Sequence, residues 1–265
     1  MLLLSRLIFV CILLYSSYAG AIVNIENMRV DSDDKTHGFD GKLALDINGK
    51  NGNTQNSKAG FGGRAQWYAE NGTRFAVLNY EYGESSDAKD TDKTFLHFRN
   101  IGYLKNQLNG GYSRGFAWEA FAQLENNEFT RLSLRTLLGA GVRWRMLHDS
   151  EQTAYLGLGV FRSKEKLEST LLATDAGVSY SNRMNFYLVY KYILADHARL
   201  VNTLYYQPDI DEASDYRLFD QIGLLVDITS NLSFKLSVDV TRDSRPPQLI
   251  KKTDTSYNSG FEYRF

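Results

Sequence analysis

The sequence predicts an all-β protein, a transmembrane antiparallel β-barrel of about twelve strands that close as a meander. Apolar and polar residues alternate in repeated segments of about 10 to 13 residues, the length at which a tilted strand crosses a membrane. After residue 21, no run approaches the roughly 18 apolar residues of a membrane helix. A membrane chain without such a run must close as a barrel, because lipid offers no partner to unpaired backbone groups.

The N-terminal residues predict a cleavable secretory signal. Arg6 precedes an apolar core at residues 7–14, and small residues follow at 19–21. Cleavage could follow Ala19 or Ala21, and the sequence favours Ala21.

The chain is therefore expected to divide into a signal peptide (1–21), an N-terminal periplasmic tail (22–38) and an outer-membrane barrel (39–265). Its one cysteine, Cys11, lies in the signal, so the mature chain offers no disulfide and no thiolate ligand for a metal. The mature chain has 29 basic and 31 acidic residues, and this near-neutral balance argues against nucleic acid as a partner.

Twelve alternating segments follow the tail. We expect them at residues 39–48, 58–69, 73–83, 93–104, 115–125, 131–146, 152–163, 183–194, 198–207, 216–228, 232–242 and 254–265. The second and third are joined by a tight turn in which Asn71 and Gly72 form a strong hairpin signal. Residues 165–182, given below as a connection, could hold additional strand.

The sixth segment alternates most clearly. Its apolar face carries Leu132, Leu134, Leu138, Ala140, Val142, Trp144 and Met146. Its other face carries Arg131, Ser133, Arg135, Gly139, Gly141, Arg143 and Arg145. A helix would scatter the arginines, whereas a strand aligns them. Because Arg at the bilayer midplane costs about 2 to 4 kcal/mol, we expect all four to point into the barrel. Arg131 and Arg135 would then lie toward the external mouth, and Arg143 and Arg145 toward the periplasmic end.

The connections fall into two sets. Those at 70–72, 148–151, 195–197 and 229–231 are short, and those at 49–57, 84–92, 164–182, 208–215 and 243–253 are long and polar. Short and long connections alternate along the chain, with two exceptions: 105–114 is long where a short turn is expected, and 126–130 is short where a long loop is expected. Short periplasmic turns and longer external loops are typical of outer-membrane barrels. Both termini are thus expected in the periplasm.

The last segment ends on an aromatic carboxyl terminus. Phe261, Tyr263 and Phe265 share one face, and Glu262 and Arg264 share the other. This ending resembles the assembly signal by which outer-membrane barrels are recognised for insertion. The aromatic face is expected to meet lipid and the charged face the barrel interior.

Three stretches resemble a known family. They are GKNGNT at residues 49–54, NEFTRLSLR at 127–135 with LGAG at 138–141, and RPP at 245–247 leading to KTD at 252–254. They are similar to the bacterial salt-induced outer-membrane protein family, whose members are catalogued under a domain of unknown function. The resemblance covers about residues 22–265. It implies an outer-membrane barrel of a Gram-negative bacterium, and it carries no catalytic residues to transfer.

The interior charges allow two interpretations. Glu119 and Glu125 on the fifth segment could pair with the arginines of the sixth, and Glu262 and Arg264 would face the interior too. In one interpretation, these charges neutralise each other and hold the barrel's register. In the other, the arginines form a positive ladder that biases a narrow pore toward anions.

The sequence gives little support to catalysis. Of the four histidines, His37 lies in the tail, His148 and His197 lie in short turns, and His97 lies in the fourth segment. None has a serine partner in a recognisable motif or a metal-ligand spacing. His97 is expected to be an interior hydrogen-bonding residue. No catalytic, cofactor-binding or metal-binding residue is therefore predicted.

The acidic loops at 84–92 and 208–215 are expected to be solvated, although they could bind divalent cations that bridge lipopolysaccharide phosphates. The leading functional hypothesis is a narrow passive channel, with a tie to osmotic or salt stress that rests on the family resemblance. The alternative is a non-conducting structural or interaction barrel with an ion-paired lumen, and an outer-membrane enzyme comes third. Expected partners are outer-membrane lipid and lipopolysaccharide, the barrel-assembly machinery, and small ions or solutes.

Overall fold

The computed structural model describes residues 35–50, 56–85, 88–105 and 111–265. These residues form a closed antiparallel barrel in which each strand pairs with its sequence neighbours and β1 pairs with β12. The strands are β1 (Gly38–Lys50), β2 (Asn56–Ala69), β3 (Gly72–Ser85), β4 (Ala88–Lys105), β5 (Tyr112–Asn127), β6 (Leu132–His148), β7 (Gln152–Leu167), β8 (Gly177–Ala195), β9 (Ala198–Pro208), β10 (Tyr216–Asp227), β11 (Leu232–Asp243) and β12 (Thr253–Arg264). The predicted fold class and strand number are confirmed.

The predicted signal peptide (1–21) and most of the predicted tail (22–38) lie outside the described residues. In the part of the chain that is described, no helix is long and apolar enough to cross a membrane. A short 3-10 helix, Glu128–Thr130, connects β5 to β6.

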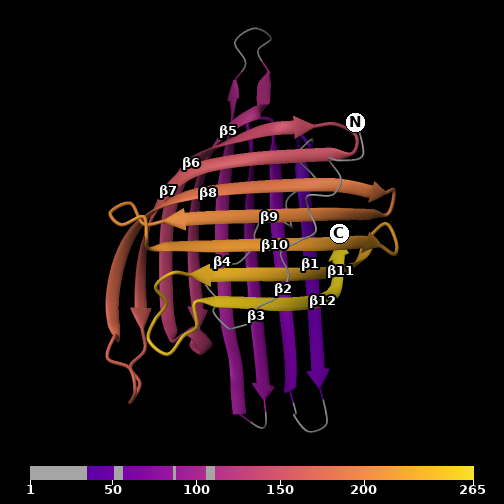
Figure 1. Cartoon of the computed structure of the whole chain (residues 1–265). Helices are drawn as coiled ribbons and strands as arrows, with labels where there is room; N and C mark the ends of the chain where they lie inside the picture. Colours follow the sequence, from indigo (N-terminus) through magenta and orange to yellow (C-terminus); the bar gives the residue numbers. More distant parts are fainter. Residues whose placement is uncertain (1–34, 51–55, 86–87, 106–110) are drawn as a thin grey trace, which may run out of the picture.

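The barrel has two distinct ends. We call one the turn end; it holds both ends of the barrel, Gly38 and Arg264, and the connections β2–β3, β4–β5, β6–β7, β8–β9 and β10–β11. We call the other the loop end; it holds the connections β1–β2, β3–β4, β5–β6, β7–β8, β9–β10 and β11–β12. In Figure 1, the front strands β9, β10 and β11 cross the steeply running strands β1 to β4 behind them, so the strands are strongly tilted.

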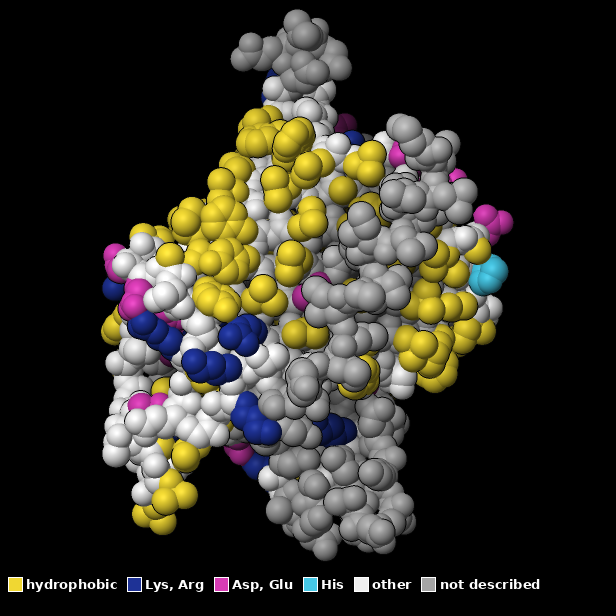
Figure 2. Space-filling model, viewed as in Figure 1, with side chains coloured by type: hydrophobic (Ala, Val, Ile, Leu, Met, Phe, Trp, Pro, Cys, Tyr) yellow, Lys and Arg dark blue, Asp and Glu magenta, His cyan; other side chains and the backbone are white. Residues whose placement is uncertain are grey.

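The outer surface is apolar between two aromatic bands. Exposed aromatic side chains, mostly Phe and Trp, gather toward the turn end, where they include Phe39, Trp67, Phe116, Trp144, Tyr263 and Phe265. Exposed tyrosines gather toward the loop end: Tyr80, Tyr82, Tyr180, Tyr206 and Tyr257. Exposed aliphatic residues such as Leu138, Leu158 and Val160 lie between them. Figure 2 shows hydrophobic side chains over much of one face. Such a surface suits a hydrocarbon layer bounded by two interfaces.

Two pairs of strands are longer than the sequence predicts. β3 reaches Ser85 and β4 begins at Ala88, so most of the predicted loop 84–92 is strand. β7 reaches Leu167 and β8 begins at Gly177, which shortens the predicted loop 164–182 to residues 168–176. Residues 88–92 and 164–166 are almost all polar, so a hydrophobic pattern does not reveal these parts of the strands. β8, by contrast, begins with Val178 and Tyr180 alternating with serines.

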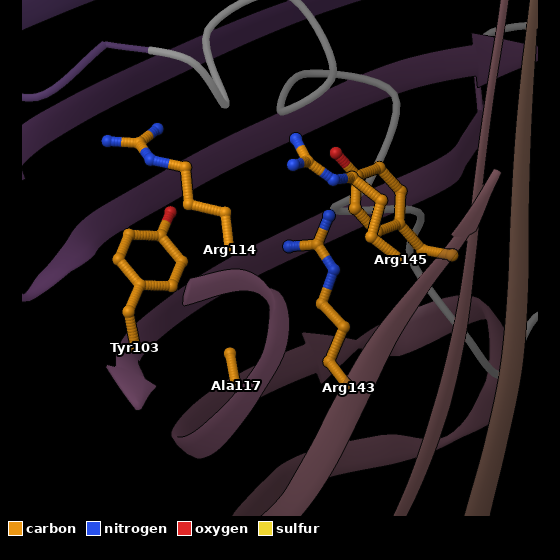
Figure 3. Close-up of a pocket in the computed structure, with 6 residues that line it drawn as sticks. Tyr103, Arg114, Ala117, Arg143 and Arg145 are labelled. Atoms are coloured by element: carbon orange, nitrogen blue, oxygen red, sulfur yellow. The ribbon is translucent and has the colours of Figure 1, made fainter. Parts of the chain in front are cut away.

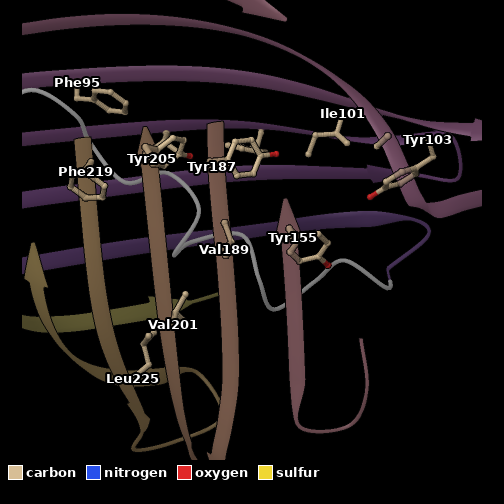
Figure 4. Packing of buried hydrophobic residues seen from close by; sticks show 13 residues of the cluster. Phe95, Ile101, Tyr103, Tyr155, Tyr187, Val189, Val201, Tyr205, Phe219 and Leu225 are labelled. Carbon is tan, nitrogen blue, oxygen red and sulfur yellow. The ribbon is translucent and has the colours of Figure 1, made fainter. Parts of the chain in front are cut away.

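The barrel interior is packed with aromatic and aliphatic side chains in its middle. Phe75, Val77, Phe95 and Val189 are fully buried, and Tyr187, Tyr205 and Phe219 join the same cluster. Figure 4 shows Phe95 of β4 close to Tyr187, Tyr205 and Phe219 of β8, β9 and β10. The Tyr187 and Tyr205 rings lie 5.5 Å apart between centroids.

Candidate functional site: the charged barrel interior

A continuous series of ion pairs lies inside the barrel at the loop end. Arg135 of β6 lies between two carboxylates, with Nη1 3.0 Å from Glu125 Oε2 of β5 and Nε 3.0 Å from Glu165 Oε1 of β7. The cross-strand register explains both contacts, because Arg135 is paired with Glu125 on one side and with Glu165 on the other.

The series continues across the lumen. Arg217 of β10 donates to both carboxylate oxygens of Glu165, at 2.7 and 3.0 Å, although β8 and β9 separate their strands in the barrel wall. Arg217 Nε also donates to Asp243 of β11 at 3.0 Å. The series Glu125–Arg135–Glu165–Arg217–Asp243, which we call the charge bridge, thus joins β5 to β11. It places two guanidiniums among three carboxylates in a largely buried setting, where such pairs hold only if well matched in geometry.

A second cross-lumen contact lies near the middle of the barrel. Glu119 of β5 accepts hydrogen bonds from Tyr187 Oη of β8 at 2.7 Å and from Arg99 Nη1 of β4 at 3.3 Å. Arg99 also lies over the ring of Phe121, 5.2 Å from its centroid. His97 is buried beside them and stacks near Phe75, Phe95 and Phe121.

Loop contacts lie above the charge bridge. Arg131 donates to the Asp175 carboxylate at 2.7 Å, and to the backbone oxygens of Glu168 and Gln248. The Gln248 backbone N–H donates to the other oxygen of Asp175 at 2.7 Å. This backbone hydrogen bond, followed by the one from Arg131, holds the pKa of Asp175 below its ordinary value. The β7–β8 and β11–β12 connections are therefore joined over the mouth.

A further pair joins the β9–β10 and β11–β12 connections. Arg245 donates to both carboxylate oxygens of Glu212, and Ser214 Oγ donates to one of them. Hydrogen bonds from Arg245 and then Ser214 keep the pKa of Glu212 below its ordinary value. Among the residues that the structure describes, no group of three or more His, Cys, Asp and Glu side chains is arranged to hold a metal ion.

The turn end carries a different set of charges. Lys42 of β1 contacts Glu262 of β12 at 2.9 Å inside the seam that closes the barrel. A pocket in the turn-end half, between β4 and β7, is lined by Tyr103, Arg114, Ala117, Arg143, Arg145 and Tyr155. Arg143 lies flat over the Tyr155 ring, with its Cζ 3.5 Å from the ring centroid, and Arg114 lies 5.1 Å from that of Tyr103. Figure 3 shows the three guanidinium groups around one space.

The register of the sixth segment holds from Leu134 to Met146. Leu138, Trp144 and Met146 are exposed on the outside, while Arg135 and Arg143 are buried on the inside. Arg145 is half-buried at the pocket.

Two assignments from the sequence are wrong. Arg131 lies before β6 rather than in it, with a left-handed φ of 58° that ends the 3-10 helix. Leu132 faces inward and is 3% exposed, because the register shifts between Leu132 and Leu134. Glu119 contacts Arg99 and Tyr187, and its Cα partner on β6 is Gly141.

The remaining predicted positions lie at the seam between β1 and β12. Arg264 is the Cα partner of Lys42, and the Lys42–Glu262 contact lies on the interior side. Phe261, Tyr263 and Phe265 are about half exposed on the outside. β12 ends at Arg264, but Phe265 still exchanges both backbone hydrogen bonds with Gly41, at 3.0 and 3.1 Å.

Sequence reasoning did not single out Glu165, Arg217, Asp243 or Tyr187. Glu165 and Asp243 lie in segments that were expected to be loops, and Arg217 and Tyr187 lie in predicted strands. The one available indication was Glu165 itself, an acidic residue that pairs with Arg135 on the next strand.

The fold and the site define a closed twelve-stranded barrel with an apolar outer face and a charged, ion-paired interior. Residues 44–265 match the family described as "Protein of unknown function, DUF481", and the chain belongs to this family. Comparison of the sequence with curated proteins finds no match.

Several solved barrels are similar in structure. The KdgM porin in complex with disordered oligogalacturonate is 13% identical, with a TM-score of 0.44 over 86% of this chain and 99% of that chain. The NanC porin is 10% identical, with a TM-score of 0.47 over 85% and 99%. The translocator domain of the autotransporter NalP from Neisseria meningitidis is 13% identical, with a TM-score of 0.42 over 88% and 90%.

Proposed function

We propose that the protein is a non-catalytic outer-membrane barrel whose lumen is closed at the loop end by the charge bridge. The Glu165–Arg217 contact carries this proposal, because it joins strands that are not neighbours and so must cross the lumen. The packed cluster around Tyr187 and Tyr205 adds a second obstruction at mid-height. Both features favour a structural or interaction barrel over an open porin.

The outer surface supports the membrane location. Its two aromatic bands enclose an aliphatic zone, as in barrels that contact lipid directly. We place the loop end outside and the turn end, with both chain ends, in the periplasm, because short turns face the periplasm in such barrels. Lipid, and lipopolysaccharide near the loop-end tyrosines, are then the proposed surroundings. The barrel-assembly machinery is the proposed partner of the closing strand.

Planar-bilayer recording of the refolded mature protein tests closure. The wild type should be electrically silent, whereas a variant that combines E165A/R217A with Y187A should show discrete open levels, because it removes the ion pair and the tyrosine that cross the lumen. The matched control is E212A/R245A, which removes an exposed ion pair from the same end. It should stay silent. Stable open levels in the wild type would overturn the proposal.

A narrow anion-preferring channel is the second candidate, and the three arginines at the turn-end pocket favour it. Wild-type open levels with anion preference would support this function instead. The resemblance to salt-induced proteins adds an expectation shared by both candidates. Cells that lack the protein should grow more slowly than the parent strain in high-salt medium, and complementation should restore growth.

A further inference from the structure

The outer face of β7 changes from apolar to cationic along the strand. Its exposed positions alternate with more buried ones, and from the turn end to the loop end they carry Leu156, Leu158, Val160, Arg162, Lys164 and Lys166. The three apolar residues belong to the aliphatic zone of the outer surface. The three cations, which we call the outer cation ladder, follow directly toward the loop end, about 7 Å apart along the strand.

The paired positions on the neighbouring strands bring no negative charge to this ladder. On β6, the Cα partners of the three cations are Leu138, Thr136 and Leu134. On β8, they are Asn182, Tyr180 and Val178. Glu165 lies between two of the cations in the sequence, but it points inward and pairs with Arg135 and Arg217. The outer cation ladder can therefore attract an anion from outside the chain.

One aromatic ring gathers two of these cations. Arg162 Cζ lies 5.5 Å from the ring centroid of Tyr180, and Lys164 Nζ lies 5.9 Å from it. Tyr180 is 60% exposed and belongs to the aromatic band of the loop end. Tyrosines in such bands lie at the level of the lipid head groups. Two like charges drawn to one ring repel each other, and an anion between them would offset this repulsion.

We propose that the outer cation ladder and Tyr180 bind the phosphate groups of lipid A, the membrane-embedded part of lipopolysaccharide. Lipid phosphates lie at the boundary between hydrocarbon and water, and this is the level at which the apolar part of β7 ends. Lys and Arg at this level attract anionic head groups and donate charge-assisted hydrogen bonds to them. The acyl chains of the same molecule would then lie against Leu158 and Val160. The inference rests on the proposed function, which places the loop end outside.

Native mass spectrometry of the refolded mature protein in detergent measures the binding. The probes are bisphosphorylated lipid A and the same lipid A after enzymatic removal of both phosphates. The wild type should bind the bisphosphorylated form on the order of tenfold more tightly, because each cation near an anionic head group contributes severalfold to the affinity. R162Q/K164Q/K166Q should bind both forms alike. Its three changed side chains are exposed, so this variant should fold, which heat-modifiable mobility on gels will check.

R242Q/K251Q/K252Q is the matched control. It removes three exposed cations from β11 and the β11–β12 connection at the same end of the barrel, and it should keep the preference for the bisphosphorylated form. Equal loss of the preference in this control would show that net charge alone governs binding and would overturn the site. An unchanged preference in R162Q/K164Q/K166Q would overturn it as well. Inorganic phosphate at the same concentration should not displace the lipid, and displacement would overturn the assignment to a lipid ligand.

A separate measurement tests the orientation on which this inference rests. Leu172 lies in the β7–β8 connection and is 80% exposed, and residues 22–265 contain no cysteine. A membrane-impermeant maleimide should label L172C on intact cells. Labelling combined with an unchanged lipid preference in R162Q/K164Q/K166Q would overturn this inference alone. Labelling that appears only after the outer membrane is permeabilised would overturn the proposed orientation, and the lipid A site with it.

Discussion

Arg217 of β10 and Glu165 of β7 form a bidentate ion pair across the lumen, with N–O distances of 2.7 and 3.0 Å. Every other pair in the charge bridge joins adjacent strands. A cross-strand pair fixes register, but a pair that crosses the lumen also fixes the distance between the β7 and β10 parts of the wall, which lie three strands apart. Glu165 is the central residue, because it accepts from both Arg135 and Arg217.

Changing Glu165 to Gln should therefore destabilise the barrel strongly. Two largely buried guanidiniums would lose their shared carboxylate, and breaking a buried pair on one side costs about 3 to 5 kcal/mol. Urea unfolding of the refolded protein in lipid measures the change. E212Q, which alters an exposed pair on the loops, should change stability little. Equal effects in the two variants would show that the charge bridge contributes no more than a surface contact.

Gly141 should not tolerate a side chain. An added Cβ would lie 2.5 Å from the Leu158 backbone oxygen and 2.8 Å from Gly159 Cα, so β6 and β7 would have to move apart. We expect G141A to lower the free energy of unfolding by about 1 to 3 kcal/mol, as overpacking does. The control is G63A, where the nearest atom is 3.9 Å from the new Cβ. Wild-type urea midpoints for both variants would contradict the close approach.

The barrel and most of its registers follow from the sequence because lipid requires an apolar outer face on every strand. The alternation from Leu134 to Met146 therefore predicts the inward direction of Arg135 and Arg143. It fails at Leu132, where a bulge changes the face of the chain without changing the residue pattern.

The partners of the charges are much harder to predict. Glu125 and Arg135 are adjacent across a hairpin, so the sequence indicates their contact. The Tyr187–Glu119 and Arg217–Glu165 contacts depend on the width of the lumen and on strand tilt. The alternation of residues within one strand determines neither the width of the lumen nor the strand tilt. The cross-lumen contacts therefore cannot be predicted from it and are seen only in the structure.

The loop contacts over the mouth should persist to acidic pH. The pKa of Asp175 is held below its ordinary value of 3.8 in the folded protein. Because the folded pKa is the lower one, this stabilisation is fully present at neutral pH and is lost as the pH falls through the folded pKa. We expect the β7–β8 and β11–β12 connections to stay joined at pH 5 and to separate only below about pH 4.

Spin labels at the exposed residues Leu172 and Leu249 measure this separation, because residues 22–265 contain no other cysteine. The distance between labels should stay narrow from pH 7 to 5 and broaden at pH 3. In D175N it should be broad at every pH, since the charged acceptor is gone. Broadening of the wild-type distance already at pH 6 would contradict the assignment to Asp175.

The closing strand should be essential for assembly through its outer aromatic face. Tyr263 and Phe265 are about half exposed on the outside. The Phe265 ring packs so closely on Gly41 of β1 that a side chain at position 41 would clash with it. Changing both to Asp places two charges on the lipid side of the strand that completes the barrel, and deleting Phe265 removes its two backbone hydrogen bonds to Gly41. We expect both variants to be absent from the outer-membrane fraction as heat-modifiable barrels. The control Y263F/F265Y keeps the aromatic rings and should assemble normally. Normal assembly of the Asp variant would show that these aromatics are ordinary surface residues.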